Sequence, residues 1–179
     1  MYKNITKLHN INSIKTGDCG LISSNSWLAK KIQYFQKCIW NHAFIFWWNY
    51  DELFVIEAAR RGICLTPFSD YINSNKKIMI LKPNFKVDGS EYGSFMLKYC
   101  GRTRYGYSNL LLAQSIKFIT AGRVWIGPSV NEKTKTFICG EFVAFVYNHF
   151  NKWLFEDWNR LAPSDIYNCI IFEHYLFEK

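Results

Sequence analysis

Residues 40–59 read Trp-Asn-His-Ala-Phe-Ile-Phe-Trp-Trp-Asn-Tyr-Asp-Glu-Leu-Phe-Val-Ile-Glu-Ala-Ala and form the most informative segment of the chain. Two apolar runs, 42–48 and 53–58, are separated by Asn-Tyr-Asp-Glu, a polar stretch that favours a turn. Both runs have the length of a strand and are apolar at consecutive positions, which is typical of strands buried on both faces. The sequence therefore predicts a β-hairpin inside the protein.

The segments around this hairpin alternate between strand and helix patterns. A turn at Gly17 and Asp18 leads into a predicted strand, and further strands are predicted over 62–66 and 77–82. Helices are predicted over 26–38, 67–72, 90–100, 109–120 and 139–150, and a final strand or helix over 166–172. This order predicts an α+β fold with a β-rich N-terminal half followed by helices.

Composition excludes several classes of protein. The 179 residues favour a single domain, 1–179, and contents of 49% hydrophobic and 18% aromatic residues exclude a disordered chain. The apolar runs fall short of the roughly 18–20 residues that span a bilayer, so no transmembrane segment is predicted. The first ten residues lack the apolar core of a signal peptide, which favours the cytoplasm. Association with a virus particle and release on lysis are the alternatives.

Charge and cysteine content bear on the partners. A net charge of +8 favours anionic partners in general, including nucleic acid, acidic envelope polymers and acidic protein surfaces. The six cysteines are scattered, without the close pairs of a disulfide framework. Neither a glycine-rich nucleotide motif nor Cys-x-x-Cys is present, so we expect no cofactor and no metal site. The spacings of Cys38 with His42 and Cys169 with His174 are the weak alternative for zinc.

Cys139 lies where loop residues give way to the helix predicted over 139–150. A thiol at a helix N-terminus meets unpaired N–H groups and the positive end of the helix dipole, which both favour the reactive thiolate. Gly140 would let a substrate or another backbone segment approach closely. The alternative is a buried, inert cysteine in an apolar helix.

His42 is the best placed of the four histidines to act as a base, because it opens a buried strand. His149 falls ten residues after Cys139 on the same predicted helix, roughly 15 Å away, and His9 and His174 are expected at the surface. A four-residue loop would place Glu57 diagonal to His42 at about 7–8 Å between Cα atoms, within reach of its side chain. A structural histidine, and Arg60 or Arg61 as the partner of Glu57, are the alternatives.

An ordered set of short motifs resembles the permuted papain-like cysteine hydrolases, most closely the YiiX-like branch of the NlpC-type superfamily. The motifs are Gly17-Asp18, Trp40-Asn41-His42-Ala43, Val55-Ile56-Glu57-Ala58, the segment 62–71, Tyr105-Gly106-Tyr107, Cys139-Gly140-Glu141-Phe142-Val143 and Pro163-Ser164-Asp165. The resemblance runs from about residue 15 to 167. Gly140 where the family has Ser, Asn41 before the histidine, and Tyr107-Ser108 in place of Tyr-Asp depart from the family pattern.

The resemblance implies a circularly permuted papain-like fold, with a small antiparallel β-barrel or sheet packed against helices. It assigns the nucleophile to Cys139, the base to His42 and the orienting carboxylate to Glu57. Such a Cys-His-Glu triad hydrolyses through an acyl-enzyme. The backbone N–H of Cys139 would supply part of an oxyanion hole, and we single out Asn41, Tyr107 and Gly140 as substrate-side residues.

Three functions remain open from the sequence. Cleavage of amide bonds in a peptide, such as the stem peptides of peptidoglycan, is favoured. Lipid acyl hydrolysis or acyl transfer on the same residues is the second candidate. The third is a non-catalytic papain-like module that binds a partner, for example in the assembly of a virus or phage particle. No specific binding of nucleic acid is expected.

Overall fold

The computed structural model describes residues 5–74, 76–105, 136–150 and 161–178. The strands of its main sheet are β1 (Ile5–Leu8), β2 (Cys19–Ser23), β3 (His42–Asn49), β4 (Glu52–Ala59), β5 (Gly62–Pro67), β6 (Lys77–Pro83) and β9 (Phe172–Phe177). Its α-helices are α1 (Trp27–Gln36), α2 (Phe68–Ile72), α3 (Gly89–Leu97), α5 (Cys139–His149) and α6 (Pro163–Asn168). A 3-10 turn, η1 (Ile11–Ser13), and the short pair β7 (Arg104–Tyr105) and β8 (Thr136–Phe137) complete the described elements.

The seven strands form an open mixed sheet in the order β1-β9-β6-β2-β3-β4-β5. The strands from β9 to β5 pair antiparallel, whereas β1 and β9 pair parallel at one edge. The α+β class is therefore confirmed, but the sheet is neither closed into a barrel nor wholly antiparallel. The physical reason is that β1 and β9 meet side by side, so β1 and β5 are the edge strands, and on the outer side of β5 Ile63 is hydrogen-bonded to Gly101 and Thr103.

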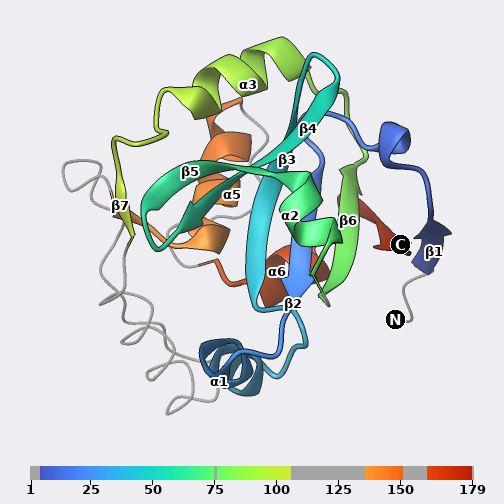
Figure 1. Ribbon diagram of the computed structural model, residues 1–179, viewed down its shortest axis with the longest axis vertical. Coiled ribbons are helices and arrows are strands. Elements are labelled where there is room, and N and C mark those ends of the chain that lie inside the picture. The colour runs from blue at the N-terminus through green and yellow to red at the C-terminus, as the bar shows by residue number, and fades with distance from the viewer. Residues whose placement is uncertain (1–4, 75, 106–135, 151–160, 179) are drawn as a thin grey trace.

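Both faces of the sheet are covered, which explains why the strands are apolar at consecutive positions. On one face, Ala43, Ile45 and Ile56 pack in a cluster with residues of α5 and α3. On the other face, Phe44 and Phe46 pack with residues of α2 and of the N-terminal segment. Figure 1 shows α5 and α2 on opposite sides of β3.

The predicted hairpin is present with the predicted register. Trp48 pairs with Leu53, and the strands extend one residue further to Asn49 and Glu52 around a turn in which Tyr50 has a positive φ of 51°. The β3–β4 ladder ends at Ile45 and Ile56. Beyond that point β3 stays with β2 while β4 stays with β5, and the two strands diverge (Figure 1).

Most of the other predicted elements appear within a few residues of their expected bounds. The helix predicted over 109–120 lies outside the described residues. The C-terminal prediction was partly wrong, because α6 begins at Pro163 and a separate strand, β9, follows it. The edge strand β1 was not predicted. None of the helices within the described residues is long and apolar enough to cross a bilayer.

Candidate active site

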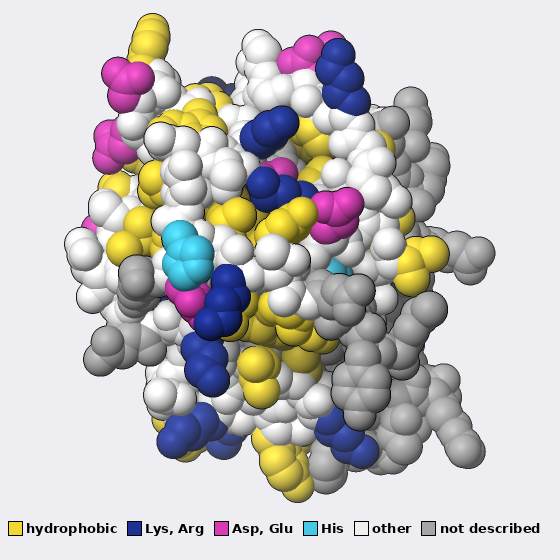
Figure 2. Space-filling view, turned by 90° about the vertical axis from the view of Figure 1, so that its right-hand side faces the viewer, with side chains coloured by type: hydrophobic (Ala, Val, Ile, Leu, Met, Phe, Trp, Pro, Cys, Tyr) yellow, Lys and Arg dark blue, Asp and Glu magenta, His cyan; other side chains and the backbone are white. Residues whose placement is uncertain are grey.

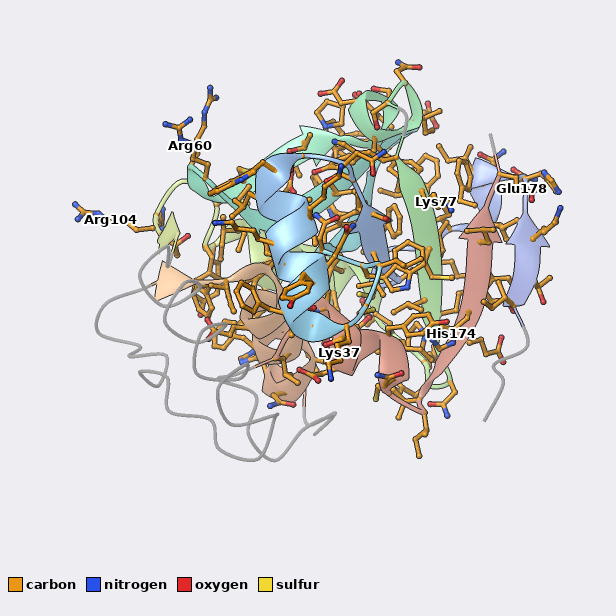
Figure 3. All side chains as sticks on the ribbon, turned by 90° about the horizontal axis from the view of Figure 1, so that it is seen from below. Lys37, Arg60, Lys77, Arg104, His174 and Glu178 are labelled. Carbon is orange, nitrogen blue, oxygen red and sulfur yellow. The ribbon has the colours of Figure 1, made fainter. Side chains whose placement is uncertain are left out.

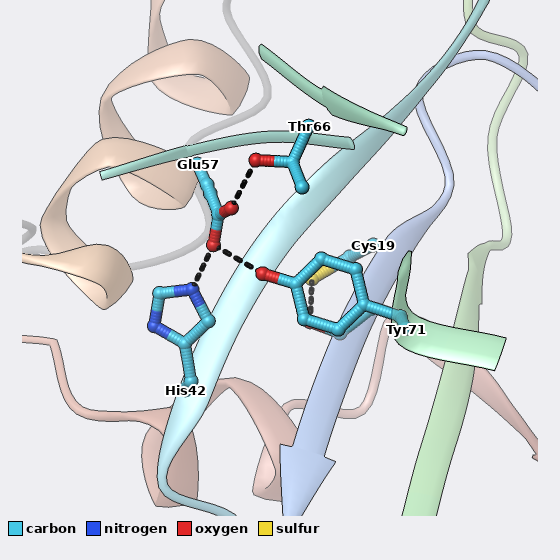
Figure 4. Close-up of polar contacts among 6 residues, drawn as sticks. Cys19, His42, Glu57, Thr66 and Tyr71 are labelled. Atoms are coloured by element: carbon cyan, nitrogen blue, oxygen red, sulfur yellow. Dashed lines mark hydrogen bonds and ion pairs between the residues drawn. The ribbon is translucent and has the colours of Figure 1, made fainter. Parts of the chain in front are cut away.

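His42 and Glu57 meet where β3 and β4 diverge. His42 Nε2 lies 2.5 Å from Glu57 Oε2, as Figure 4 shows. The Glu57 side chain is almost fully buried, whereas 19% of the His42 side chain remains exposed. The predicted contact between these two residues is thus present. In the part of the chain that the structure describes, the ion pair of Glu57 is with His42 and not with Arg60 or Arg61.

Two further hydroxyl groups hold the Glu57 carboxylate. Thr66 on β5 donates from Oγ1 to Glu57 Oε1 at 2.7 Å, and Tyr71 on α2 donates from its hydroxyl to Oε2 at 2.7 Å (Figure 4). Both carboxylate oxygens therefore have partners, which fixes the plane of the group that faces His42. No role was predicted for Thr66 or Tyr71 from the sequence, although a buried carboxylate implies partners of this kind.

The pair strongly favours its ionised form. Burial raises the pKa of Glu57, but the hydrogen bond and the positive charge of His42, with the two hydroxyl donors, outweigh it and lower the pKa to about 2. Burial likewise opposes protonation of His42. Hydrogen bonds to Cys139 and Glu57, and the Coulombic attraction of both, prevail and raise the pKa of His42 to about 10. An imidazolium held between an acid and a thiol is the electrostatic result.

Cys139 is the first residue of α5, as predicted, and it is buried. Its hydrogen bond to His42 brings the thiol and the imidazole together. The residue before it, Ile138, occupies the N-cap and has no side-chain oxygen for the first-turn N–H groups of the helix. The N-terminus of α5 therefore presents donors and a positive dipole beside the sulfur.

Gly140 is explained by backbone packing. A Cβ atom at this position would lie 2.0 Å from the carbonyl oxygen of Leu161, so only glycine allows the segment before α6 to pack against α5. The sequence suggested that either a substrate or another backbone segment approaches Gly140, and the contact in the structure is with the backbone of Leu161. A substrate contact by this residue remains a prediction, and Tyr107 lies outside the described residues.

Asn41 is anchored with one side of its amide turned toward protein donors. Its Oδ1 accepts from the Ser24 N–H at 2.7 Å and from Gln33 Nε2 at 3.2 Å. Because these donors fix the oxygen, the amide nitrogen Nδ2 points the other way. Asn41 also lines the cavity that reaches His42, and its contact with a substrate remains a prediction.

That cavity has a volume of about 230 Å³ and lies between α1 and the diverging strands. Its walls are largely apolar, with His42 and Asn41 at one side and Arg60 at the rim. The lining residues are Ser26, Leu28, Ala29, Ile32, Asn41, His42, Ala58, Ala59 and Arg60. Ile32 also packs against Ile138, which links the α1 wall to the start of α5.

The remaining cysteines and histidines have structural surroundings. None of the six cysteines forms a disulfide bond, and burial raises the pKa values of Cys19, Cys64 and Cys100. His149 ends α5 and stacks on Phe95 with the ring centroids 3.8 Å apart, far along the helix from Cys139 as predicted.

The expected surface position of His174 was wrong. It is buried on β9, where Nε2–H donates to the carbonyl of Tyr167 at 2.8 Å, so this nitrogen is not available to a metal. Within residues 5–74, 76–105, 136–150 and 161–178, no three His, Cys, Asp or Glu side chains cluster closely enough to hold a metal ion.

Comparison with solved structures finds a similar fold in metalloprotein YiiX from Escherichia coli O157:H7. The TM-score is 0.64 with 14% sequence identity, and the similarity covers 90% of this chain and 96% of YiiX. No family model matches the chain, and no curated protein matches it. The chain is therefore YiiX-like in fold.

Proposed function

We propose that this protein is a cysteine hydrolase with a circularly permuted papain-like arrangement, in which Cys139 is the nucleophile, His42 the base and Glu57 the orienting carboxylate. The observation that carries the proposal is the bond between His42 and Glu57, together with the contact of the same imidazole with the thiol at the start of α5. Thiol, imidazole and acid in this order are the components of nucleophilic acyl transfer.

Nε2 of His42 is hydrogen-bonded to Glu57. Figure 4 shows the second ring nitrogen, Nδ1, on the side away from the carboxylate. We therefore assign proton exchange with the Cys139 sulfur to Nδ1. Both neighbours favour the charged imidazolium. We propose that the reacting state is the thiolate–imidazolium pair, because the thiolate is the nucleophilic form of cysteine.

The reaction then runs in two halves. The thiolate attacks the carbonyl carbon and forms a C–S bond, while the carbonyl electron pair moves to oxygen. The Cys139 N–H and Asn41 Nδ2 are the proposed donors to this oxyanion. When the C–N bond breaks, the leaving amine takes the proton from His42 Nδ1. Water next attacks the thioester, gives its proton to His42, and the C–S bond breaks to restore the thiolate.

The favoured substrate is an amide bond in a peptide, including a cell-wall stem peptide. A narrow, largely apolar cavity beside His42 suits a short aliphatic group next to the scissile bond. Lipid acyl esters are the second candidate, favoured by the exposed aromatic residues on α1, the helix that walls this cavity.

YiiX is described as a metalloprotein. The fit of a metal to this chain is poor in the residues described. His42 Nε2 is bonded to Glu57, and His174 Nε2 donates to a carbonyl, so neither histidine of the two candidate Cys–His pairs offers that atom. No step of the proposed mechanism passes through a metal.

The first experiment is alkylation of the thiols by iodoacetamide at pH 6, mapped residue by residue with mass spectrometry. Cys139 should react well ahead of Cys19, Cys64 and Cys100, whose pKa values are raised. A Cys139 rate at pH 6 no faster than that of a free thiol with a pKa of about 8.5 at the same pH would favour the non-catalytic module instead.

The second experiment offers peptidoglycan and a panel of phospholipids side by side to the wild-type protein and to Cys139→Ala. Release of amines identifies an amidase, and release of fatty acid identifies the lipid activity. Products that appear equally with Cys139→Ala would contradict the assignment of the nucleophile.

A further inference from the structure

Four of the nine large apolar side chains that are exposed among the described residues lie on α1 or just after it, and the other five are on separate segments. Trp27 is 71% exposed and Tyr34 68%, and Ile39 beyond the end of the helix is 55% exposed. Leu28 is also exposed, at the border of the cavity. Such a group of exposed aromatic and aliphatic residues is unusual on a protein surface and marks an interaction site.

The same helix carries only positive charge. Lys30 and Lys31 are exposed on it, Lys37 follows at its C-cap, and no Asp or Glu occurs between Asp18 and Asp51. The lower end of Figure 2, where α1 lies, shows Lys or Arg and hydrophobic side chains without acidic ones. Any partner of this surface is therefore expected to be anionic.

The orientation of α1 is fixed by its buried side. Ala29, Ile32 and Gln36 recur at helical spacing and face the protein. Trp27, Lys30, Lys31 and Tyr34 consequently share the outward side, which is turned to the viewer in Figure 3 with Lys37 at its C-terminal end. Lys31 Nζ lies 3.9 Å from the centre of the Trp27 ring, so charge and aromatic surface form one patch.

We propose that this α1 surface, comprising Trp27, Lys30, Lys31, Tyr34 and Lys37, docks onto anionic phospholipid bilayers. Exposed Trp and Tyr rings suit the boundary between headgroups and acyl chains, and the lysines suit anionic headgroups. Single-stranded nucleic acid would also accept lysines and aromatic rings. The aliphatic Leu28 and Ile39, which stack on no base but enter the acyl region, favour the bilayer.

Docking would also place the cavity at the membrane. Leu28 and Ala29 of α1 line the cavity that reaches His42, so a bilayer held against α1 brings lipid carbonyl groups near the entrance. The proposed docking rests only on the exposure and the charge of the α1 residues. Only its use in delivering a lipid substrate rests on the proposed hydrolase function.

Vesicle flotation tests the proposal, with the Cys139→Ala protein used throughout so that no reaction can alter the lipid. The vesicles are phosphatidylcholine with and without phosphatidylserine, at low and high salt. The protein should float with the anionic vesicles and be released by salt. Because a lysine near an anionic surface changes affinity about fivefold, Lys30→Glu with Lys31→Glu should weaken binding by about 25-fold or more.

The matched control reverses two exposed lysines that flank α3, Lys86→Glu with Lys98→Glu, which gives the same net charge at the end of the molecule opposite α1 (Figure 1). It should change binding less than about twofold, because only charges within a Debye length of the bilayer contribute. Trp27→Ala should weaken binding to anionic vesicles, and Tyr50→Asn, at another exposed aromatic residue whose positive φ Asn tolerates, should not.

Equal loss in the α1 variant and the α3 control would overturn the proposal, as would the absence of vesicle binding. Binding of single-stranded DNA that falls with the lysine reversals, while vesicles do not bind, would make α1 a nucleic-acid surface and reject the membrane. None of these outcomes depends on hydrolysis. Failure of the docking proposal is thus distinguishable from failure of the proposed function, which the alkylation of Cys139 tests separately.

Discussion

Two buried glutamates, Glu57 on β4 and Glu141 on α5, have pKa values shifted in opposite directions. They are 4% and 2% exposed, and burial raises the pKa of both. Glu57 receives hydrogen bonds from the side chains of His42, Thr66 and Tyr71, and its pKa falls to about 2. Glu141 accepts from the Ile138 N–H at 3.0 Å, and its pKa stays raised, at about 8.

Burial therefore does not decide whether a carboxyl group is ionised in this protein. The charge and number of its partners decide it, because one neutral N–H does not compensate for lost hydration whereas an imidazolium with two hydroxyl groups does. Glu57 is built to hold a charge beside His42. Glu141, two residues after Cys139, is neutral near pH 7 and does not oppose a thiolate at the start of the helix.

The largest contrast is expected in reactivity. Glu57→Gln should lower hydrolytic turnover on the order of 10²–10⁴-fold, because the amide neither stabilises the imidazolium nor fixes its tautomer. Alkylation of Cys139 at pH 6 should slow at least about tenfold for the same reason. Glu141→Gln should remain within about threefold of wild type in both measurements, since its amide preserves the bond to Ile138. Similar losses in the two variants would contradict the contrast.

Stability should separate the same two residues by pH. The pKa of Glu141 is raised in the folded state from 4.5, so the stability linked to it is complete at low pH and is lost as pH rises toward about 8. Glu141→Gln should thus match wild type near pH 4 and exceed it by about 2–4 kcal/mol near pH 9.

The stability linked to Glu57 runs in the reverse direction. It is present above the ordinary pKa of 4.5 and is lost as pH falls toward about 2. Urea unfolding across the pH range, followed by circular dichroism, measures both trends. A pH-independent difference between Glu141→Gln and wild type would contradict the assignment of a raised pKa to Glu141.

Removal of the Tyr71 hydroxyl should have a smaller effect. Tyr71→Phe keeps the ring that packs against Phe44 but deletes the donor to Glu57 Oε2. We expect a loss of about 1–2 kcal/mol in unfolding free energy, since a hydrogen bond to a charged group is lost. The His42 pKa, followed by NMR, should also move, which a purely structural role of Tyr71 would not cause.

The smallest effect is expected for Thr66→Val. The hydroxyl bonded to Glu57 Oε1 is lost, but Thr66 is half-buried, so water can replace part of the bond. A destabilisation of about 0.5–1 kcal/mol is expected in urea unfolding. Thr66→Ser retains the donor and serves as the control. A loss for Thr66→Val larger than that for Tyr71→Phe would show that Oε1, not Oε2, dominates the stabilisation of the carboxylate.

The sequence predicted best what depends on local pattern. The hairpin register followed from the turn length and from continuous apolar strands, and it correctly brought Glu57 to His42. The helix that begins at Cys139 followed from its apolar spacing. Thr66 and Tyr71 were missed as partners of Glu57, because their approach depends on how β5 and α2 fold over β4 rather than on any periodicity.

Long-range pairings were beyond prediction for the same reason. Ile5–Leu8 has only four residues, and its sequence does not indicate a strand. Most of its residues are exposed, and it forms a strand because Phe172–Phe177 pairs with it. The sequence suggested that Gly140 allows a close approach, but it did not indicate which segment approaches. The partner is the backbone of Leu161, about twenty residues away in a segment with no distinctive spacing.

The position of β9 has a consequence for biosynthesis. Because β9 inserts between β1 and β6, the sheet stays incomplete until Phe172–Phe177 has left the ribosome. Until then the nascent chain displays an unpaired β6 edge lined by hydrophobic residues, a template for aggregation. A premature stop codon before Phe172 would leave that edge unpaired, so such truncations should accumulate as insoluble protein although every proposed catalytic residue is present.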